Sequence, residues 1–464
     1  MKKVLAGAVL FSLVLLLLCS QCSPLYPLNI WDDANCLLTV GRAMRHGAVL
    51  YRDIYEQKGP LLYVLHALAA WMTESSFLGV FILEVLFLAG TLAVLCRTLG
   101  GWSLRGLSAA ALCMALTVAS PVFCQGDSAE EFSLIFLCVP LMLTRRTDGR
   151  LGAREAFVCG ACAGCVAMIK YSMLGLFAGL CLGQLALLLG EGRGRELPAQ
   201  IGAFAAGALV VLAPVTAVLL SRGALGAAVE AYIVNNIFHY ALRSDLSRMT
   251  ELLRGNALYL LALLAGLVLC ARRLREHRRE TVLCLAMAAG QLLMIAASRI
   301  WAYSLLAMAP FLVLVPWGLQ EGARRLPGAV YALALPAALA LAGGLTPNAY
   351  LRGIPLDNTA QGRLATYMYE NATLLQYSHL DDGLYLTSGA LPVTRFFVRL
   401  NVDFDEMNRE LDRYLVEAVP DFVLVSWREL PPEFDRYHLI ATDATYDDSG
   451  RMNKLLYLYR RVEV

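Results

Sequence analysis

The chain has 464 residues, of which 58% are hydrophobic and only 16% charged, whereas soluble globular domains carry about 25% charged residues. A soluble core does not need this excess of apolar residues, but a surface that faces lipid does. Residues 1–344 hold 27 Lys and Arg against 19 Asp and Glu, while residues 345–464 hold 12 against 18. The acidic balance of the second part argues against a tail that binds nucleic acid, and the change of sign predicts a domain boundary near residue 345.

Eleven apolar segments approach the length of about 20 residues that spans a bilayer. They are 4–21, 77–96, 104–122, 131–144, 155–169, 172–190, 200–220, 256–271, 281–297, 299–318 and 327–343. The first resembles a signal peptide, but no small-x-small cleavage site follows it, so we expect an uncleaved helix. The sequence predicts a mainly α, polytopic membrane bundle of about eleven helices over residues 1–344 and a small α/β domain over residues 345–464.

The distribution of Lys and Arg orients these segments. If the N-terminus is cytoplasmic, the short cytoplasmic segments hold 17 of the cations and the longer external loops hold 10. Lys and Arg favour the cytoplasmic side of short loops, so we expect a multi-pass protein of the plasma membrane with its tail outside. The stretch 61–73 lies in the first external loop, 23–76, and is too short to span. We expect it to be an interfacial amphipathic helix with Tyr63 and Trp71 at headgroup depth.

In the tail, residues 384–388 (LYLTS) and 422–426 (FVLVS) are predicted to be buried strands. Residues 404–418 have the pattern of an amphipathic helix that ends before Pro420. The last residues are typical of a hairpin that turns at 447–450 (DDSG).

Three cysteines in one apolar segment, Cys159, Cys162 and Cys165, have a spacing found in zinc sites. The segment is also rich in Ala and Gly, which is typical of a close contact between membrane helices. We favour the helix contact and expect no metal or other cofactor.

Polar residues gather at the predicted external ends of the spans. Asp32 and Asp33 open a helical stretch, where the alternative to a functional role is helix capping. Lys58 precedes Gly59-Pro60 at the start of the interfacial segment, where a Lys could meet a lipid phosphate or simply extend to the interface. Glu84 lies in the middle of a span and is expected to pair inside the bundle.

Further candidates lie at the same predicted depth. Asp127, Glu130 and Glu131 stand together in QGDSAEEF, where a solvated helix start would explain one or two of the three carboxylates. Lys170 and Arg299 each lie between two apolar segments and could anchor a hairpin or hold a lipid phosphate. Asp53, in the same external loop as Lys58, is a further candidate site residue.

These segments resemble, in their order, the GT-C superfamily of membrane glycosyltransferases. The closest likeness is to the bacterial aminoarabinose transferases and protein O-mannosyltransferases of the family 39 type. The matching segments are WDDAN (31–35), VLYRDIYEQKGPLLYVLHAL (49–68), SAEEF (128–132), MIKYS (168–172), SRIWAYSLLAMAP (298–310) and AVPDFVLVS (418–426). The chain differs from the better-known members by Asp-Asp in place of Asp-Glu, by Lys-Gly-Pro in place of Lys-Pro-Pro, and by Ala302 in place of His.

The resemblance implies an inverting glycosyltransferase that uses a polyprenyl-phosphate sugar from the outer leaflet. It implies that Asp33 or Asp32 is the general base and that Glu130 or Glu131 positions an acceptor hydroxyl on a glycan, lipid or protein. It further implies that Lys58, Lys170 and Arg299 stabilise the departing lipid phosphate, and fixed cations of this kind could act without a metal. The matching motifs also place Tyr303 at the phosphate site and make Tyr51 a candidate site residue.

Three other readings remain open at this stage, one of which is a non-catalytic relative whose tail binds a partner. A lipid-linked polysaccharide polymerase or ligase would place its key residues in the late external loop 221–254, which contains His239 and Arg243. A transporter or flippase of lipid-linked sugars would show internal repeats and charges within its spans.

Overall fold

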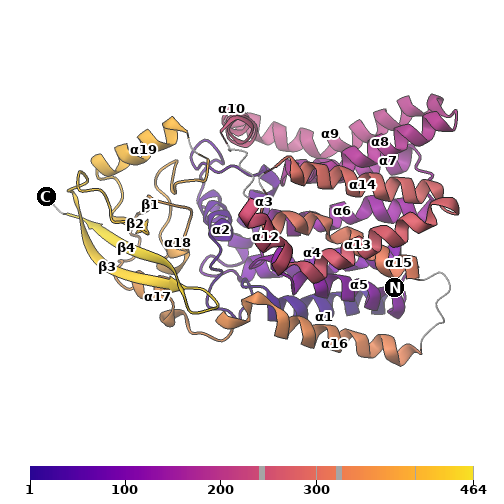
Figure 1. The fold of residues 1–464 in the computed structure, drawn as a ribbon. Helices are drawn as coiled ribbons and strands as arrows, with labels where there is room; N and C mark the ends of the chain where they lie inside the picture. The colour runs from indigo at the N-terminus through magenta and orange to yellow at the C-terminus, as the bar shows by residue number, and fades with distance from the viewer. Residues whose placement is uncertain (240–245, 299, 320–326, 403, 463–464) are drawn as a thin grey trace.

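The protein forms a bundle of long helices with a small β-sheet at one end (Figure 1). The fold is taken from a computed structural model that describes residues 1–239, 246–298, 300–319, 327–402 and 404–462. The chain starts at the end of the bundle away from the sheet, so the N-terminus and the sheet lie at opposite ends (Figure 1). An odd number of membrane-spanning helices predicts this arrangement, because the chain then leaves the bundle at the end opposite to the one where it starts.

Each of the eleven predicted spans coincides with a helix. They are α1 (Lys2–Cys19), α4 (Leu78–Thr98), α5 (Leu104–Val118), α6 (Ala129–Arg146), α7 (Ala153–Ala167), α8 (Gly175–Gly190), α9 (Leu197–Ser221), α13 (Ala257–Arg272), α14 (Arg278–Ala296), the 3-10 segment η6 (Ala302–Val313) that continues into α15 (Leu314–Leu319), and α16 (Gly328–Leu345). In the described ranges, eight helical stretches are long and apolar enough to cross a bilayer. Of the other three, α5 and α7 have 15 residues each and α6 carries charges at both ends. The predicted polytopic, mainly α fold is confirmed.

Small residues let neighbouring helices pack closely in the bundle. A Cβ atom at Gly160 of α7 would lie 2.0 Å from the carbonyl oxygen of Phe204 on α9, and one at Gly207 would lie 2.0 Å from that of Phe157. Close approach of this kind is how membrane helices gain contact. The cysteines of α7 lie in this packed segment, which agrees with the helix-contact interpretation.

The loops that were predicted to carry the cytoplasmic cations are joined by ion pairs. Arg145 at the end of α6 lies 2.9 Å from Glu280 at the start of α14, and Arg279 lies 2.5 Å from Glu191 after α8. These three helix ends therefore meet at one end of the bundle.

Shorter helices cover the end of the bundle that faces the sheet. They are α2 (Asp32–Arg45), α3 (Pro60–Met72), α10 (Leu225–Val229), α11 (Asn235–Phe238) and α12 (Leu246–Gly255). The segment predicted as an interfacial helix is α3, and its Trp71 is exposed. Tyr63, in contrast, is fully buried and its hydroxyl accepts a hydrogen bond from the Lys58 amide at 3.1 Å. Tyr63 therefore packs in the protein interior and is not an exposed anchor on the helix surface, in contrast to the prediction.

The tail contains a four-stranded sheet in the order β1-β2-β4-β3. Its elements are α17 (Ala360–Ala365), β1 (Leu374–Gln376), α18 (Leu384–Ser388), α19 (Asp405–Val416), β2 (Phe422–Ser426), β3 (Tyr437–Tyr446) and β4 (Met452–Arg461). β1 is parallel to β2, while β2–β4 and β4–β3 are antiparallel. The structure thus confirms the predicted strand at 422–426, the helix within 404–418 and the terminal hairpin.

The predicted strand at 384–388 is wrong, because these residues form the short helix α18. Glycines with positive φ bound it on both sides, Gly383 at 91° and Gly389 at 76°. The hydroxyl of Ser388 donates to the Leu384 carbonyl at 2.6 Å, which supports the helical turn. The place beside β2 is taken by β1, so tertiary pairing overrides the local strand preference.

Candidate functional site

The first turn of α2 carries the acidic pair, and the two side chains lie in different environments. Trp31 is the N-cap residue in extended conformation, and no side chain caps the helix. Asp32 and Asp33 are therefore first-turn residues. A negative charge there interacts favourably with the positive end of the helix dipole without capping the helix. Asp33 lines a cavity, whereas Asp32 contacts the tail.

Lys58 lies opposite Asp33. Its Nζ is 3.4 Å from Asp33 Oδ1 and 3.5 Å from Oε1 of the fully buried Glu56. Burial by itself would lower the pKa of Lys58, but the two carboxylates outweigh it and raise the pKa above its usual value. Lys58 is therefore a fixed cation at neutral pH.

Hydrogen bonds fix the loop that carries Lys58. The hydroxyl of Tyr51, a buried residue with a positive φ of 66°, donates to the Lys58 carbonyl at 2.7 Å. Glu56 Oε2 accepts from the Gln57 amide at 2.8 Å and from the Lys58 amide at 3.1 Å. Non-glycine residues with positive φ are uncommon, and here the surrounding contacts hold one next to the candidate site.

The Lys-Gly-Pro segment pairs with the backbone just before Lys170. The Gly59 amide donates to the Ile169 carbonyl at 3.0 Å and the Leu61 amide to the Met168 carbonyl at 2.8 Å. A Cβ at Gly59 would lie 2.3 Å from the Met168 oxygen, so only glycine fits without a shift. This close pairing brings two cations that are far apart in the sequence to one cavity.

Lys170 is held by a carboxylate and an aromatic ring. Its Nζ lies 2.6 Å from Glu130 Oε1 and 4.8 Å from the centre of the Tyr303 ring. The Tyr303 ring in turn lies 5.2 Å from the ring of Trp31, the residue that directly precedes the acidic pair in the sequence. A cation over an aromatic face is stabilised by the negative face of the ring.

The cavity between these groups has a volume of about 300 Å³. Asp33, Lys58, Lys170 and Tyr303 line it, all of them candidates from the sequence. It combines one carboxylate, two ammonium groups and aromatic walls, which suits a phosphate-bearing ligand next to a proton acceptor.

The other predicted site residues lie elsewhere. Glu130 reaches the cavity only through Lys170, and Tyr51 supports the Lys58 loop. Asp53 is exposed and paired with Arg52 at 2.7 Å. Glu131 and Asp127 are buried in a separate cluster, and Arg299 lies outside the described residues, as does Arg243 of the late external loop.

This buried acidic cluster also contains Glu84, which pairs inside the bundle as expected. Glu84 accepts from Ser20 at 2.8 Å and from the Asp127 amide at 2.9 Å. The same amide lies 3.0 Å from Glu131 Oε2, and Asp127 Oδ1 lies 2.7 Å from His66 Nε2. Burial raises the pKa of Asp127, and His66 partly offsets the effect. The cluster joins α1, α3, α4 and α6 near the end of the bundle that faces the sheet.

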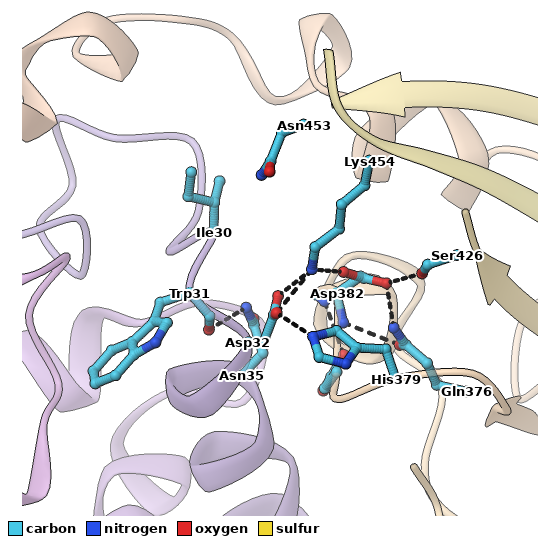
Figure 2. A network of polar contacts seen from close by, with 12 residues as sticks. Ile30, Trp31, Asp32, Asn35, Gln376, His379, Asp382, Ser426, Asn453 and Lys454 are labelled. Carbon is cyan, nitrogen blue, oxygen red and sulfur yellow. Dashed lines mark hydrogen bonds and ion pairs between the residues drawn. The ribbon is translucent and has the colours of Figure 1, made fainter. Parts of the chain in front are cut away.

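Asp32 faces the tail (Figure 2). Lys454 Nζ donates to both of its carboxylate oxygens, at 2.6 and 2.8 Å, and His379 Nε2 lies 3.0 Å from Oδ2. Burial by itself would raise the pKa of Asp32, but His379 and Lys454 outweigh it and hold the pKa below its usual value. These two partners make Asp32 a poor proton acceptor.

The sequence profile described as "Putative competence-induced protein Ccs4 N-terminal domain" matches residues 1–325. The chain belongs to this family. No curated protein sequence matches the chain.

Solved structures with the same fold are membrane glycosyltransferases. The crystal structure of ArnT from Cupriavidus metallidurans bound to undecaprenyl phosphate matches with a TM-score of 0.61 at 13% identity, over 98% of each chain. The arabinofuranosyltransferase AftD from Mycobacteria matches with a TM-score of 0.54 at 14% identity, over the whole of this chain and 40% of AftD. This member of the Ccs4 family therefore has the GT-C fold, as the sequence motifs predicted, and is a multi-pass membrane protein.

Sequence reasoning missed two contributions from the tail. Asn401 lines the cavity and its Oδ1 accepts from Gln57 Nε2 at 2.6 Å, and Lys454 binds Asp32. Both contacts join residues more than 300 positions apart, and the local sequence around each contains no signal for them.

Proposed function

We propose that this chain is a membrane glycosyltransferase that moves a sugar from a polyprenyl-phosphate donor to an acceptor hydroxyl. One observation carries the proposal: Asp33 and Lys58 are opposed at 3.4 Å in a cavity that Lys170 also lines. A proton acceptor beside two fixed cations is what this reaction requires. The relative with a bound undecaprenyl phosphate supports a lipid-phosphate donor.

In the proposed reaction the acceptor oxygen bonds to the anomeric carbon while the bond from that carbon to the phosphate oxygen breaks. The hydroxyl proton passes to Asp33, and the bonding electron pair leaves with the polyprenyl phosphate. Attack from the face opposite the leaving group inverts the anomeric centre. Lys58 and Lys170 neutralise the charge that develops on the phosphate, and fixed cations of this kind need no reorganisation during the reaction.

Asp33 is a better candidate for the base than Asp32. Asp33 lines the cavity, whereas both Lys454 and His379 bind Asp32 and hold its pKa below its usual value. Glu130 is assigned to hold Lys170 in place through the 2.6 Å ion pair.

We infer that this cavity opens on the non-cytoplasmic side, and that residues 1–344 form the membrane domain and residues 345–464 an external domain. The ion-paired arginines in the last turn of α6 and the first turn of α14 support a cytoplasmic location for the opposite end.

The test is mass spectrometry of envelope lipids and glycans from a strain without the gene, complemented with wild type or with Asp33→Asn. We expect the deletion to remove one sugar modification, wild type to restore it and Asp33→Asn to fail at normal protein levels. Asp357→Asn, an exposed tail aspartate, is the matched control and should restore it. Full restoration by Asp33→Asn would refute the assignment and favour the polymerase or flippase readings.

A further inference from the structure

The first turn of α2 is held from the tail by an ion-pair network that is buried on its tail side and partly buried at Asp32 (Figure 2). Lys454 on β4 binds Asp32 through both carboxylate oxygens and also pairs with Asp382. The Lys454 side chain is 10% exposed and that of Asp382 is 2% exposed. Interactions between buried charges are screened little by salt and are geometrically specific.

The tail side of this network is rigid because the sheet holds it. Asp382 Oδ2 accepts from the Ser426 hydroxyl on β2 at 2.6 Å and from the Gln376 amide on β1. The Lys454 Nζ also lies 5.4 Å from the centre of the Trp427 ring. Three strands of the tail therefore fix the point at which the ammonium group meets α2.

We propose that Lys454 is a positioning residue: by holding Asp32 to the sheet it fixes the first turn of α2, and with it the Asp33 carboxylate opposite Lys58. The inference rests on the proposed function, in which Asp33 is the base. Asp32 and Asp33 are consecutive in one helical turn, so a shift of one moves the other. A displacement of about 1 Å at reacting groups can cost on the order of 100-fold in rate.

The tail also reaches the opposite wall of the cavity. Asn401 binds Gln57, the neighbour of Lys58, at 2.6 Å. The tail thus contacts both segments that supply the opposed charges, one through Lys454 and the other through Asn401. Contacts of this kind set the distance between the two segments.

The experiment compares full-length wild type, Lys454→Met and Lys454→Arg in detergent by two readouts. Hydrogen exchange of residues 32–36 reports the first turn of α2 whether or not the protein is active. Turnover is measured with the lipid extract of the deletion strain as donor. For Lys454→Met we expect faster exchange at 32–36 and a kcat about 10- to 100-fold lower at an unchanged apparent KM for the lipid extract. Lys454→Arg, which keeps the charge, should retain most of the wild-type protection from exchange at 32–36 and most of the wild-type kcat.

Arg461→Met is the control, because it breaks the 2.6 Å pair with Asp421 inside the tail, and the other side-chain hydrogen bonds of these two residues go to Thr373, Ala418 and Val419, which also belong to the tail. It should leave exchange at 32–36 and turnover unchanged. The double variant Asp32→Asn/Lys454→Met removes the unpaired carboxylate and keeps the test valid if Lys454→Met does not fold; it should show the same faster exchange.

Wild-type exchange at 32–36 in the Lys454→Met or double variant would overturn the inference, as would a change confined to KM. Retained turnover in Asp33→Asn would instead refute the proposed function, and the exchange readout would still decide whether Lys454 fixes α2.

Discussion

Adjacent aspartates at 32 and 33 acquire different chemistry from their surroundings. Asp33 faces a cavity and the ammonium group of Lys58, which also pairs with Glu56. Asp32 is tied to a lysine and a histidine of the tail. The carboxyl group is the same in both, so the partners alone decide which is available to accept a proton.

Lys58→Met should destabilise the protein, because it leaves Asp33 and Glu56 without their shared cation. Removal of one partner from a buried ion pair costs about 3–5 kcal/mol. Thermal unfolding in detergent measures the loss, and Glu56→Gln/Lys58→Met should recover part of it because one unpaired charge is removed. Equal unfolding temperatures for wild type and Lys58→Met would contradict the buried pairing.

The Asp32 carboxyl should stabilise the fold in a pH-dependent way. Its pKa in the folded protein is below the value of about 3.9 for an unfolded chain. The stabilisation is therefore fully present above about pH 4 and is lost as the pH falls through the folded pKa. The difference in stability between wild type and Asp32→Asn should shrink as the pH falls below about pH 4. A difference in stability that grows as the pH falls would contradict the predicted direction of this pH dependence.

At the scale of elements, α2 connects the bundle to the tail along its whole length. Thr39 donates to Asp381 at 2.7 Å, and Arg42 donates to the Tyr385 carbonyl at 2.9 Å and to the Gly389 carbonyl at 3.1 Å. Burial raises the pKa of Asp381 to about 7. α2 also packs against α3, whose first residues follow Lys58. The candidate site therefore depends on how α2, α3 and the tail meet.

Gly59→Ala tests the meeting of the Lys58 loop with the segment before Lys170. The added Cβ would lie 2.3 Å from the Met168 oxygen, so the loop must move and the two lysines must separate. We expect lower stability by about 1–3 kcal/mol, the usual cost of overpacking, and at least 10-fold weaker binding of undecaprenyl phosphate, measured by native mass spectrometry. Gly190→Ala, where an added Cβ meets nothing within 4 Å, is the control and should bind like wild type.

At the scale of the whole molecule, the charges are divided between the two ends. Ion-paired arginines join the loops at one end, and the cavity with its lysines and carboxylates lies beside the tail at the other. The N-terminus and the sheet lie at opposite ends of the bundle (Figure 1). This division fits a catalytic surface on one side of a membrane.

Cysteine labelling tests this orientation. We expect a membrane-impermeant maleimide to label Ser449→Cys, in the exposed hairpin turn, in intact cells. Asp148→Cys, in the loop after α6, should react only after the membrane is opened. The parent protein, whose cysteines are mostly buried, sets the background. The reverse pattern of labelling would put the candidate site in the cytoplasm and exclude the proposed donor geometry.

The sequence by itself determined the features that depend on local patterns. Backbone groups in a bilayer must be satisfied within each segment, so apolar runs of about 20 residues specify helices, and β2, α19 and the terminal hairpin follow from periodicity and turn residues. Asp33, Lys58 and Lys170 were also found as candidates, because charged residues at the ends of apolar spans stand out. Tyr303 was added by the resemblance of residues 298–310 to the GT-C family.

Only the tertiary structure decided the environment of those residues. It separated Asp32 from Asp33, added Asn401 and Lys454 from the tail, buried Tyr63 and turned residues 384–388 into a helix. Hydropathy and turn chemistry act between near neighbours, whereas an ion pair between residues 32 and 454 exists only once the chain has packed. The physical reason is that burial and charge pairing belong to the assembled interior, and no local window of sequence contains both partners.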